Sequence, residues 1–274
     1  MPIRRDLIIG PPNQYYVRVD TALGSPVFAD PAERAELTGL LEQLRPVFEC
    51  RWFAWACEPA SLHLVLAHRA EVLDSDDQLH RRWARLGGRN VPPANRLRER
   101  LGTLSGLMQT LLQRYSRGYH RRHGGSGHLW AGRYRASLLA DDAALLAAVA
   151  WLEAEIGAKL PPQASSHANR AGTPQLAPVP LRRGPGGEAL PADEAMPGMT
   201  PFPQDEVAAA LAGFADSLAE DRGSYGDALA RAWALGHPEA LSETLARLGR
   251  SSGRGRSRQL RELDDQLGLS AIWG

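Results

Sequence analysis

A break in composition limits how much of this chain can fold as one body. Residues 161–204 contain ten prolines and five glycines in 44 positions, about a third of the segment. Unpatterned proline and glycine above ~25–30% is typical of linkers, because such segments cannot build regular elements or a core. The sequence therefore predicts a main domain over 1–160, a flexible linker over 161–204, a small helical unit over 205–249 and a basic tail over 250–274.

Strand patterns come early in the main domain. Residues 14–19 are rich in tyrosine and valine, and the apolar runs 51–56 and 61–67 are joined by a short turn that contains Pro59. We expect one strand followed later by a β-hairpin. Alternation along the last run separates two faces, with Leu62, Leu64 and Leu66 on one and Ser61, His63 and Val65 on the other.

Helix patterns fill the rest of the domain. A helix is expected over 31–48, with Asp30 as its N-cap and Glu33 completing a capping box. Residues 141–156 predict an alanine-rich helix. Apolar residues at three- and four-residue spacing form a stripe that predicts a long helix ending near Gly124. The residues of this stripe are Leu101, Leu104, Met108, Leu111 and Tyr115. The order β-α-β-β-α-(β)-α favours an α+β fold with an antiparallel sheet covered by helices.

The charge of the chain is distributed unevenly. The formal net charge is +1, yet the window from His80 to Arg135 contains thirteen arginines and one acid, Glu99. That window carries +12, and the other nineteen basic and thirty acidic residues sum to −11. Such a concentration is expected where a protein contacts phosphates. A solvated arginine-rich helix surface is the alternative.

Several classes of protein are disfavoured by the sequence. No apolar run approaches the ~18–20 residues of a membrane span, and residues 1–14 lack the hydrophobic region of a signal peptide. We therefore expect a cytoplasmic protein with no membrane partner. Cys50 and Cys57 are too few for a disulfide framework or a cysteine zinc site, so we expect small buried side chains.

Three features together resemble a known family. They are His63 on the hairpin, Tyr115 on the long helix, and the run RRHGGSGHLWAGRYRAS at 121–137. The chain resembles the REP-associated tyrosine transposases of the single-tyrosine HUH superfamily. Members typically show Tyr-x-x-x-Phe-Asn-Arg-Arg-His-Gly and then Ser-Gly-His-Leu-Trp-x-Gly-Arg-Tyr, where this chain reads YSRGYHRRHG and SGHLWAGRY. The similarity covers roughly residues 8–158.

The resemblance implies a fold and a chemistry. The fold would be a ferredoxin-like antiparallel sheet with helices on one face, acting on single-stranded DNA hairpins, and a homodimer is expected. The hydroxyl of Tyr115 would attack a phosphodiester, forming a 5′-phosphotyrosyl link and releasing a 3′-OH; Tyr119, one turn later, is the alternative nucleophile. Two histidines at i and i+2 on a strand would hold Mg²⁺ or Mn²⁺, and the tyrosine would face the sheet where that ion lies.

The chain departs from the family at the metal motif. The usual Met-Pro-Asn-His-hydrophobic-His-Leu reads EPASLHL here, so Ser61 replaces the first histidine and His63 is the second. A serine hydroxyl is a poor ligand for a divalent ion. His120, which stands in place of the family's asparagine, is the candidate helper ligand. Two hypotheses follow: an active DNA transposase, or an inactive descendant that still binds DNA hairpins as a regulator. An RNA-hairpin binder is a more distant third.

The basic window supplies the candidate nucleic-acid contacts. Arginines interleaved with aromatic residues are suited to phosphate contacts and to stacking on bases. The expected contacts are Arg114, Arg117, Arg121, Arg122, His128, Trp130, Arg133, Tyr134 and Arg135. Beyond the linker, helices are expected at 205–221 and 226–250, as a DNA contact, a dimer contact or a stabilising cap. The arginines of the tail would contact phosphate or remain solvated.

Overall fold

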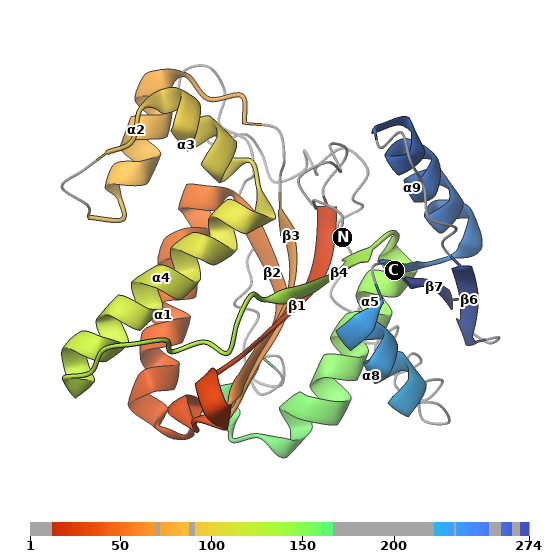
Figure 1. The fold of residues 1–274 in the computed structure, drawn as a ribbon, viewed down its shortest axis with the longest axis horizontal. Coiled ribbons are helices and arrows are strands. Elements are labelled where there is room, and N and C mark those ends of the chain that lie inside the picture. The colour runs from red at the N-terminus through yellow and green to blue at the C-terminus, as the bar shows by residue number, and fades with distance from the viewer. Residues whose placement is uncertain are drawn as a thin grey trace.

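A computed structural model describes residues 13–68, 72–87, 91–166, 222–232, 234–251, 259–264 and 269–273. The strands in these ranges form one seven-stranded sheet in the order β2-β3-β1-β4-β5-β7-β6 (Figure 1). Their bounds are β1 Asn13–Asp20, β2 Cys50–Glu58, β3 Ser61–His68, β4 Arg135–Leu139, β5 Ala234–Gly236, β6 Gln259–Asp264 and β7 Leu269–Trp273.

The helices of the described ranges all lie between β1 and β7 along the chain. Their bounds are α1 Pro31–Phe48, α2 Asp76–Ala84, α3 Ala94–Leu101, α4 Leu104–His123, α5 Asp142–Trp151, α8 Arg222–Arg231 and α9 Pro238–Ser251. Short 3-10 turns occupy Ala22–Gly24, Val27–Ala29, Gly157–Lys159 and Pro162–Ala164, and a π-helical turn spans Leu152–Ile156. Among the described residues, no helix combines the length and the apolar character needed to cross a membrane.

The first half of the chain has ferredoxin-like topology. Strands β1 and β3 pair antiparallel in the centre, β2 pairs with β3, and β4 pairs with β1. With α1 between β1 and β2, and α4 before β4, the order is β-α-β-β-α-β. The predicted α+β class is confirmed. Helices α2 and α3 form an insertion between β3 and α4.

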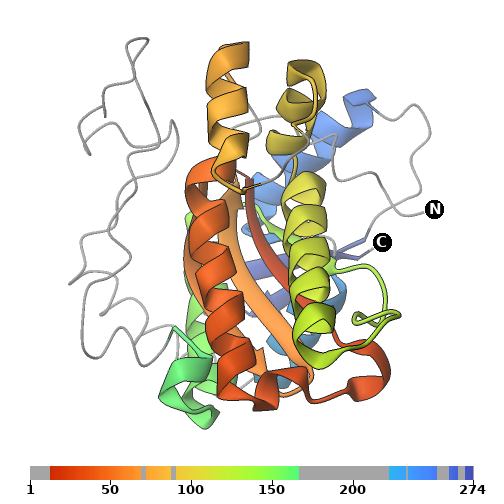
Figure 2. The ribbon, with the colours of Figure 1, turned by 90° about the vertical axis from the view of Figure 1, so that its left-hand side faces the viewer.

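One face of the sheet is covered by α1 and α4, which lie side by side in front of the strands in Figure 2. The expected alternation holds, because the leucines of β3 enter this core while Val65 enters the other. The core on this face includes Val17, Leu37, Leu62, Leu64, Leu66, Leu111 and Tyr115.

Helices also cover the opposite face, so the expectation of helices on one face only was wrong. Helices α5 and α8 pack there in a second core (Figure 1). It includes Tyr16, Ala54, Val65, Leu145, Ala148, Tyr225 and Leu229. The alanine-rich character of 141–156 lets α5 approach the sheet closely, and Asp141 caps it by accepting a hydrogen bond from the backbone N–H of Ala144 at 2.8 Å.

The C-terminal part of the chain adds strands to the sheet, which corrects the prediction of a purely helical unit followed by a tail. Strand β5 pairs parallel with β4, and β7 pairs antiparallel with both β5 and β6. Strand β6 and strand β7 lie within the predicted basic tail. The predicted helix at 205–221 and residues 167–204 of the predicted linker lie outside the described residues. Ahead of them, Ser166 donates its N–H to the carbonyl of Trp55 on β2 at 2.9 Å.

Two details of the helices differ from expectation. The predicted stripe spans two helices, because α3 ends at Leu101 and α4 starts anew after Thr103, whose hydroxyl accepts from the N–H of Gly106. Helix α1 has the predicted bounds and its cap at Asp30. Glu33, expected to complete a capping box, instead turns into the core and is 2% exposed.

Candidate functional site

Tyr115 is buried on the α1 side of the sheet. Its side chain is 3% exposed, and its ring lies between those of Phe28 and Trp130, each with centroids 5.7 Å away. The phenol donates to Oε2 of Glu33 at 2.8 Å, and it also lies 3.3 Å from the carbonyl of Glu33. The candidate nucleophile is therefore enclosed by aromatic rings and held by a carboxylate.

Glu33 is the centre of a buried polar cluster. Its Oε1 accepts from Nε of Arg122 at 2.9 Å and pairs with Nε2 of His123 at 2.9 Å. Its Oε2 accepts from Nη2 of Arg122 at 2.6 Å. Burial raises the pKa of Glu33, but the hydrogen bonds from Arg122, His123 and Tyr115 outweigh it and lower the pKa to about 2.

The state of Tyr115 follows from this cluster. Burial raises the pKa of the phenol, and the hydrogen bond to the charged Glu33 carboxylate raises it further. A nucleophilic tyrosine needs the opposite shift, toward the phenolate, or a base that can take its proton. With its low pKa, Glu33 is a weak base near neutral pH. The geometry therefore keeps Tyr115 protonated.

His63 lies on the other face of the sheet. Its Nδ1 is 2.7 Å from the hydroxyl of Tyr16, and its Nε2 is 2.8 Å from Oε2 of Glu58. Burial lowers the pKa of His63, against the opposing effect of Glu58. A neutral imidazole has one N–H, so the arrangement that satisfies both contacts has Tyr16 donating to Nδ1 and Nε2–H donating to Glu58.

Ser61 completes this second network. Its hydroxyl donates to the same Glu58 oxygen at 2.7 Å and lies 3.1 Å from Nε2 of His63. The hydrogen bond from His63, aided by Ser61, lowers the pKa of Glu58 to about 2. Ser61 and Glu58 both depart from the family pattern, and they contact each other and the remaining histidine. The network is satisfied by its own members.

The candidate nucleophile and the candidate ligand are separated by the sheet. Tyr115 belongs to the core with Leu62 and Leu64 of β3, whereas His63 bonds to Tyr16 in the α5 core. The expectation that the tyrosine would face the strand surface bearing the metal ligand was wrong. Tyr119 lies on α4 as well, half-buried with its ring stacked on His123 at 4.3 Å, so it does not reach His63 either.

The donors do not fit the expected Mg²⁺ or Mn²⁺. Both ring nitrogens of His63 are engaged by protein groups, and His120 lies on α4, with Nε2 3.0 Å from the carbonyl of Gly127. The structure thus keeps the two candidate ligands on different sides of the sheet. Within the described ranges, no group of three or more His, Cys, Asp or Glu side chains is placed to hold a metal ion. Cys50 and Cys57 are buried free thiols, as expected.

Some of the predicted nucleic-acid contacts are directed into the protein. Arg122 is neutralised by Glu33 and by Glu36, whose Oε2 is 3.2 Å from its Nη1. Trp130 is half-buried and donates Nε1–H to the carbonyl of Leu112 at 3.1 Å. Tyr134 is half-buried, with its hydroxyl 3.1 Å from that of Ser105. Arg122 joins α4 to α1, and Trp130 and Tyr134 hold the segment after α4 to that helix, which leaves these side chains little freedom to contact bases.

All but one of the other predicted contacts face solvent. The exception is Arg114, which is half-buried and donates to the carbonyl of Leu86. The remainder are exposed, and in the described part of the chain none of them forms an ion pair: Arg117, Arg121, His128, Arg133 and Arg135. They lie on the second half of α4, on the loop that follows it, and at the start of β4. This exposed set, from 117 to 135, is the candidate nucleic-acid interface.

Residues that sequence reasoning missed hold both networks in place. Glu33 has the sequence position of a capping residue, and nothing in its neighbourhood signals a partner 82 positions away. Glu58 was visible only as a departure from the family's methionine. The contact of Tyr16 with His63 depends on the register of β1 against β3. Tyr16 lies opposite Val65 in that register and therefore shares a face of the sheet with His63.

No protein-family model matches the chain, and a search of curated proteins finds no significant match.

Proposed function

We propose that this protein binds folded single strands of DNA, hairpins in particular, without cleaving them. The proposal combines two supports. The family resemblance supplies the class of ligand, and the exposed arginines between 117 and 135 supply a surface suited to phosphates. Binding by such a surface needs neither a metal ion nor a nucleophile.

The observation that carries the proposal is the separation of Tyr115 from His63. Tyr115 is buried among aromatic rings and hydrogen-bonds to a charged carboxylate. His63 lies on the opposite face of the sheet, where Tyr16 and Glu58 occupy both of its ring nitrogens. Strand cleavage by a tyrosine requires the hydroxyl and the ion to meet at one phosphate. The geometry supports retention of binding with loss of cleavage.

Binding is tested by fluorescence anisotropy with a labelled DNA hairpin, an unstructured strand of equal length, and an RNA hairpin. Affinity for the DNA hairpin should be highest and should fall steeply with salt, because each phosphate contact releases counterions. Equal affinity for all three would contradict hairpin recognition, and preference for the RNA would point to the rival ligand.

A matched pair of variants tests the surface. Arg121→Gln should lower hairpin affinity and reduce the slope of log affinity against log salt by about 0.7–0.9. Arg231→Gln removes the same charge from an exposed position of α8, on the other side of the sheet, and should leave both unchanged. Equal effects of the two changes would count against the proposed interface.

Cleavage is tested separately. The protein is incubated with hairpin DNA and Mn²⁺, and a covalent adduct is sought on a denaturing gel. We expect none. An adduct that disappears in Tyr115→Phe would overturn the non-catalytic proposal and establish the transposase reading.

A further inference from the structure

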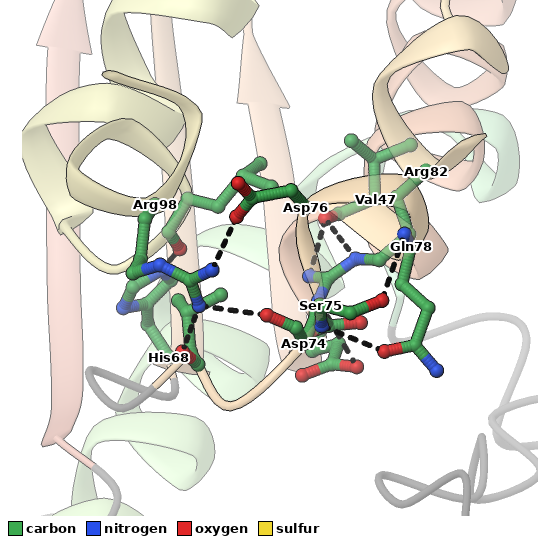
Figure 3. A network of polar contacts seen from close by, with 11 residues as sticks. Val47, His68, Asp74, Ser75, Asp76, Gln78, Arg82 and Arg98 are labelled. Atoms are coloured by element: carbon green, nitrogen blue, oxygen red, sulfur yellow. Dashed lines mark hydrogen bonds and ion pairs between the residues drawn. The ribbon is translucent and has the colours of Figure 1, made fainter. Parts of the chain in front are cut away.

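Helices α2 and α3 are attached to the core by a dense polar network, which Figure 3 shows. Arg82 donates twice to the carbonyl of Val47, at 3.1 and 2.6 Å, and forms an ion pair with Asp74. Arg98 donates to the carbonyl of Asp74 at 2.7 Å and to Oδ1 of Asp76 at 3.0 Å. The charges of these two arginines are thus balanced inside the insertion.

Arg100, two residues later, is held differently. Its guanidinium lies over the ring of Trp83, with Cζ 5.3 Å from the centroid. Its Nε donates to the hydroxyl of Thr110 at 3.1 Å, and Nη2 donates to Oε1 of Gln109 at 3.4 Å. Every one of these partners is neutral, so the side chain is oriented while its charge stays unbalanced.

Two arginines of α4 follow Thr110, the partner of Arg100, on the same helix. Arg114 is half-buried and donates to the neutral carbonyl of Leu86. Arg117, one turn later on the same helix, is exposed and forms no ion pair in the described ranges. Burial lowers the pKa of both Arg100 and Arg114, and the positive charge of Arg117 lowers each further. Leu86, which holds Arg114, donates its N–H to the carbonyl of Trp83, which holds Arg100, at 3.0 Å, so the two partners are adjacent. Arg117 is near enough to repel both of the other guanidinium groups.

We propose that Arg100, Arg114 and Arg117 form a binding site for a phosphate group, which takes up a backbone phosphate of the nucleic acid. This rests on the function proposed above and extends its surface to the α2–α3 insertion. Two guanidinium groups held by neutral partners, together with the exposed one of Arg117, match the several oxygen acceptors of a phosphate, and a bound anion relieves the repulsion from Arg117. Trp83 and Thr110 are positioning residues that hold Arg100 in place.

The site also gives a direction to the bound strand. Arg114, Arg117 and Arg121 follow one another at three- and four-residue spacing, so they share one side of α4. At 1.5 Å per residue, 114 and 121 are about 10 Å apart along the helix, roughly three nucleotides at ~3.4 Å each. The strand would follow α4 from the insertion toward the loop after it.

The main test compares Arg100→Gln, Arg117→Gln and a control, Arg231→Gln, in hairpin binding. Arg231 is exposed on α8, on the other side of the sheet. We expect a loss of about fivefold or more for the first two and less than twofold for the control. Because Arg117 is exposed, its replacement should change the stability of the fold very little, which the melting temperature checks. Equal losses in all three, or no loss in the first two, would overturn the site.

A second variant separates positioning from charge. Thr110→Val keeps the shape and the net charge but removes the acceptor for Arg100. Thr110→Val should weaken hairpin binding severalfold. It should change the slope of log affinity against log salt, which counts the ions released on binding, by less than Arg100→Gln does. An unchanged affinity would show that Arg100 acts only by its charge, against a built site.

Free phosphate distinguishes the source of the anion. Inorganic phosphate is compared with chloride at equal ionic strength, as a competitor of the hairpin and by its effect on the melting temperature. If phosphate competes specifically with the hairpin, and Arg100→Gln abolishes that competition, free phosphate is also a ligand of the site. If phosphate does not compete, but Arg100→Gln still weakens hairpin binding, the site accepts only phosphates of the nucleic-acid backbone. If the parent protein binds no hairpin, the proposed function is wrong. The phosphate site would still be supported if phosphate raises the melting temperature of the parent and Arg100→Gln abolishes that rise. If the parent shows neither hairpin binding nor this rise, the proposed function and the phosphate site are both wrong.

Discussion

The hydroxyl of Tyr115 and the carboxylate of Glu33 form a buried pair that favours the protonated phenol. The same carboxylate also receives Arg122 and His123, so its charge is balanced by the helix that carries the tyrosine. The arrangement is typical of a structural hydrogen bond that joins α1 to α4. It accounts for the arginine-histidine part of the family-like motif without any role in chemistry.

Replacing Tyr115 with Phe should therefore affect stability more than binding. The change removes a hydrogen bond to a buried charged group, a loss of about 1.5–3 kcal/mol in the free energy of unfolding. Hairpin affinity should stay within twofold of the parent. Urea unfolding and anisotropy measure the two quantities, and a large loss of affinity at unchanged stability would contradict a structural role.

Stability should fall in acid because of Glu33. Its pKa is about 2 in the folded protein against an ordinary value of 4.5, so its contribution is complete above pH 4.5 and is lost as the pH falls toward 2. Urea unfolding at pH 6, 4 and 3 should show this decline. Glu33→Gln should be less stable than the parent at pH 6, and its stability should decline less between pH 6 and pH 3. The decline should be smaller still in Glu33→Gln/Glu58→Gln, because the pKa of Glu58 is also about 2. A parallel decline in the parent and in Glu33→Gln would count against the assignment.

At the scale of elements, successive side chains of β3 point to opposite faces of the sheet, which separates the polar residues of this strand from its leucines. Its leucines pack against α4, and Ser61 and His63 face the α5 side. The sequence contained both facts, the alternation of β3 and the apolar stripe that includes Tyr115. Together they place the tyrosine with the leucines and away from His63, but the family resemblance led to the opposite arrangement.

Restoring the missing histidine should consequently fail to restore cleavage. In Ser61→His, Nε2 of His63 still faces Glu58, and Tyr115 remains across the sheet. We expect no Mn²⁺-dependent adduct with this variant or with Ser61→His/Glu58→Met, although the double change should bind Mn²⁺ more tightly by calorimetry. Adduct formation by either one would show that the two faces can meet.

Local sequence signals predicted elements well where end signals and periodicity agreed. Helix α1 has its predicted bounds because Asp30 and Pro31 mark its start. The break between α3 and α4 was missed because the spacing of Leu101 and Leu104 also suits one continuous helix. Strand β5, three residues long with the sequence Ala-Leu-Gly, has too little alternation to be recognised and depends on pairing with β4.

The junction of α3 and α4 depends on Gly106. A Cβ there would overlap the carbonyl oxygen of Arg100, whereas one at Gly39 of α1 would meet nothing within 4 Å. Gly106→Ala should destabilise the protein by about 1–3 kcal/mol and weaken hairpin binding by displacing Arg100. Gly39→Ala should stabilise it by up to about 1 kcal/mol. Thermal unfolding and anisotropy compare them, and equal effects would contradict the close approach.

For the whole molecule, the uneven charge of the sequence becomes a difference between two sides. The described residues of the window 80–135 lie in α2, α3, α4 and the loop that follows, all in the layer that covers one face (Figure 2). The opposite layer, α5 and α8, contains two aspartates and two arginines and is formally neutral. A net charge of +1 is thus compatible with a strongly basic surface.

Strand β7 is the middle one of the three strands that the C-terminal part adds to the sheet. It lies between β5 and β6, and Leu269, Ala271 and Ile272 are fully buried. Removing residues 269–274 should lower the melting temperature by many degrees and expose apolar surface to a dye such as ANS. Removing Gly274 alone leaves β7 whole and should have little effect. Equal melting temperatures would show that the added strands are dispensable.

This position of β7 sets an order for folding during synthesis. Strands β1 to β4 can pair as soon as residue 139 has left the ribosome, but β5 and β6 can be joined only after residue 273 has been translated. Until then the nascent chain exposes the edge of β5 that β7 covers and part of the α5 core. A chain released from the ribosome before residues 269–273 are complete would have an open sheet edge and would be a substrate for chaperones and proteases.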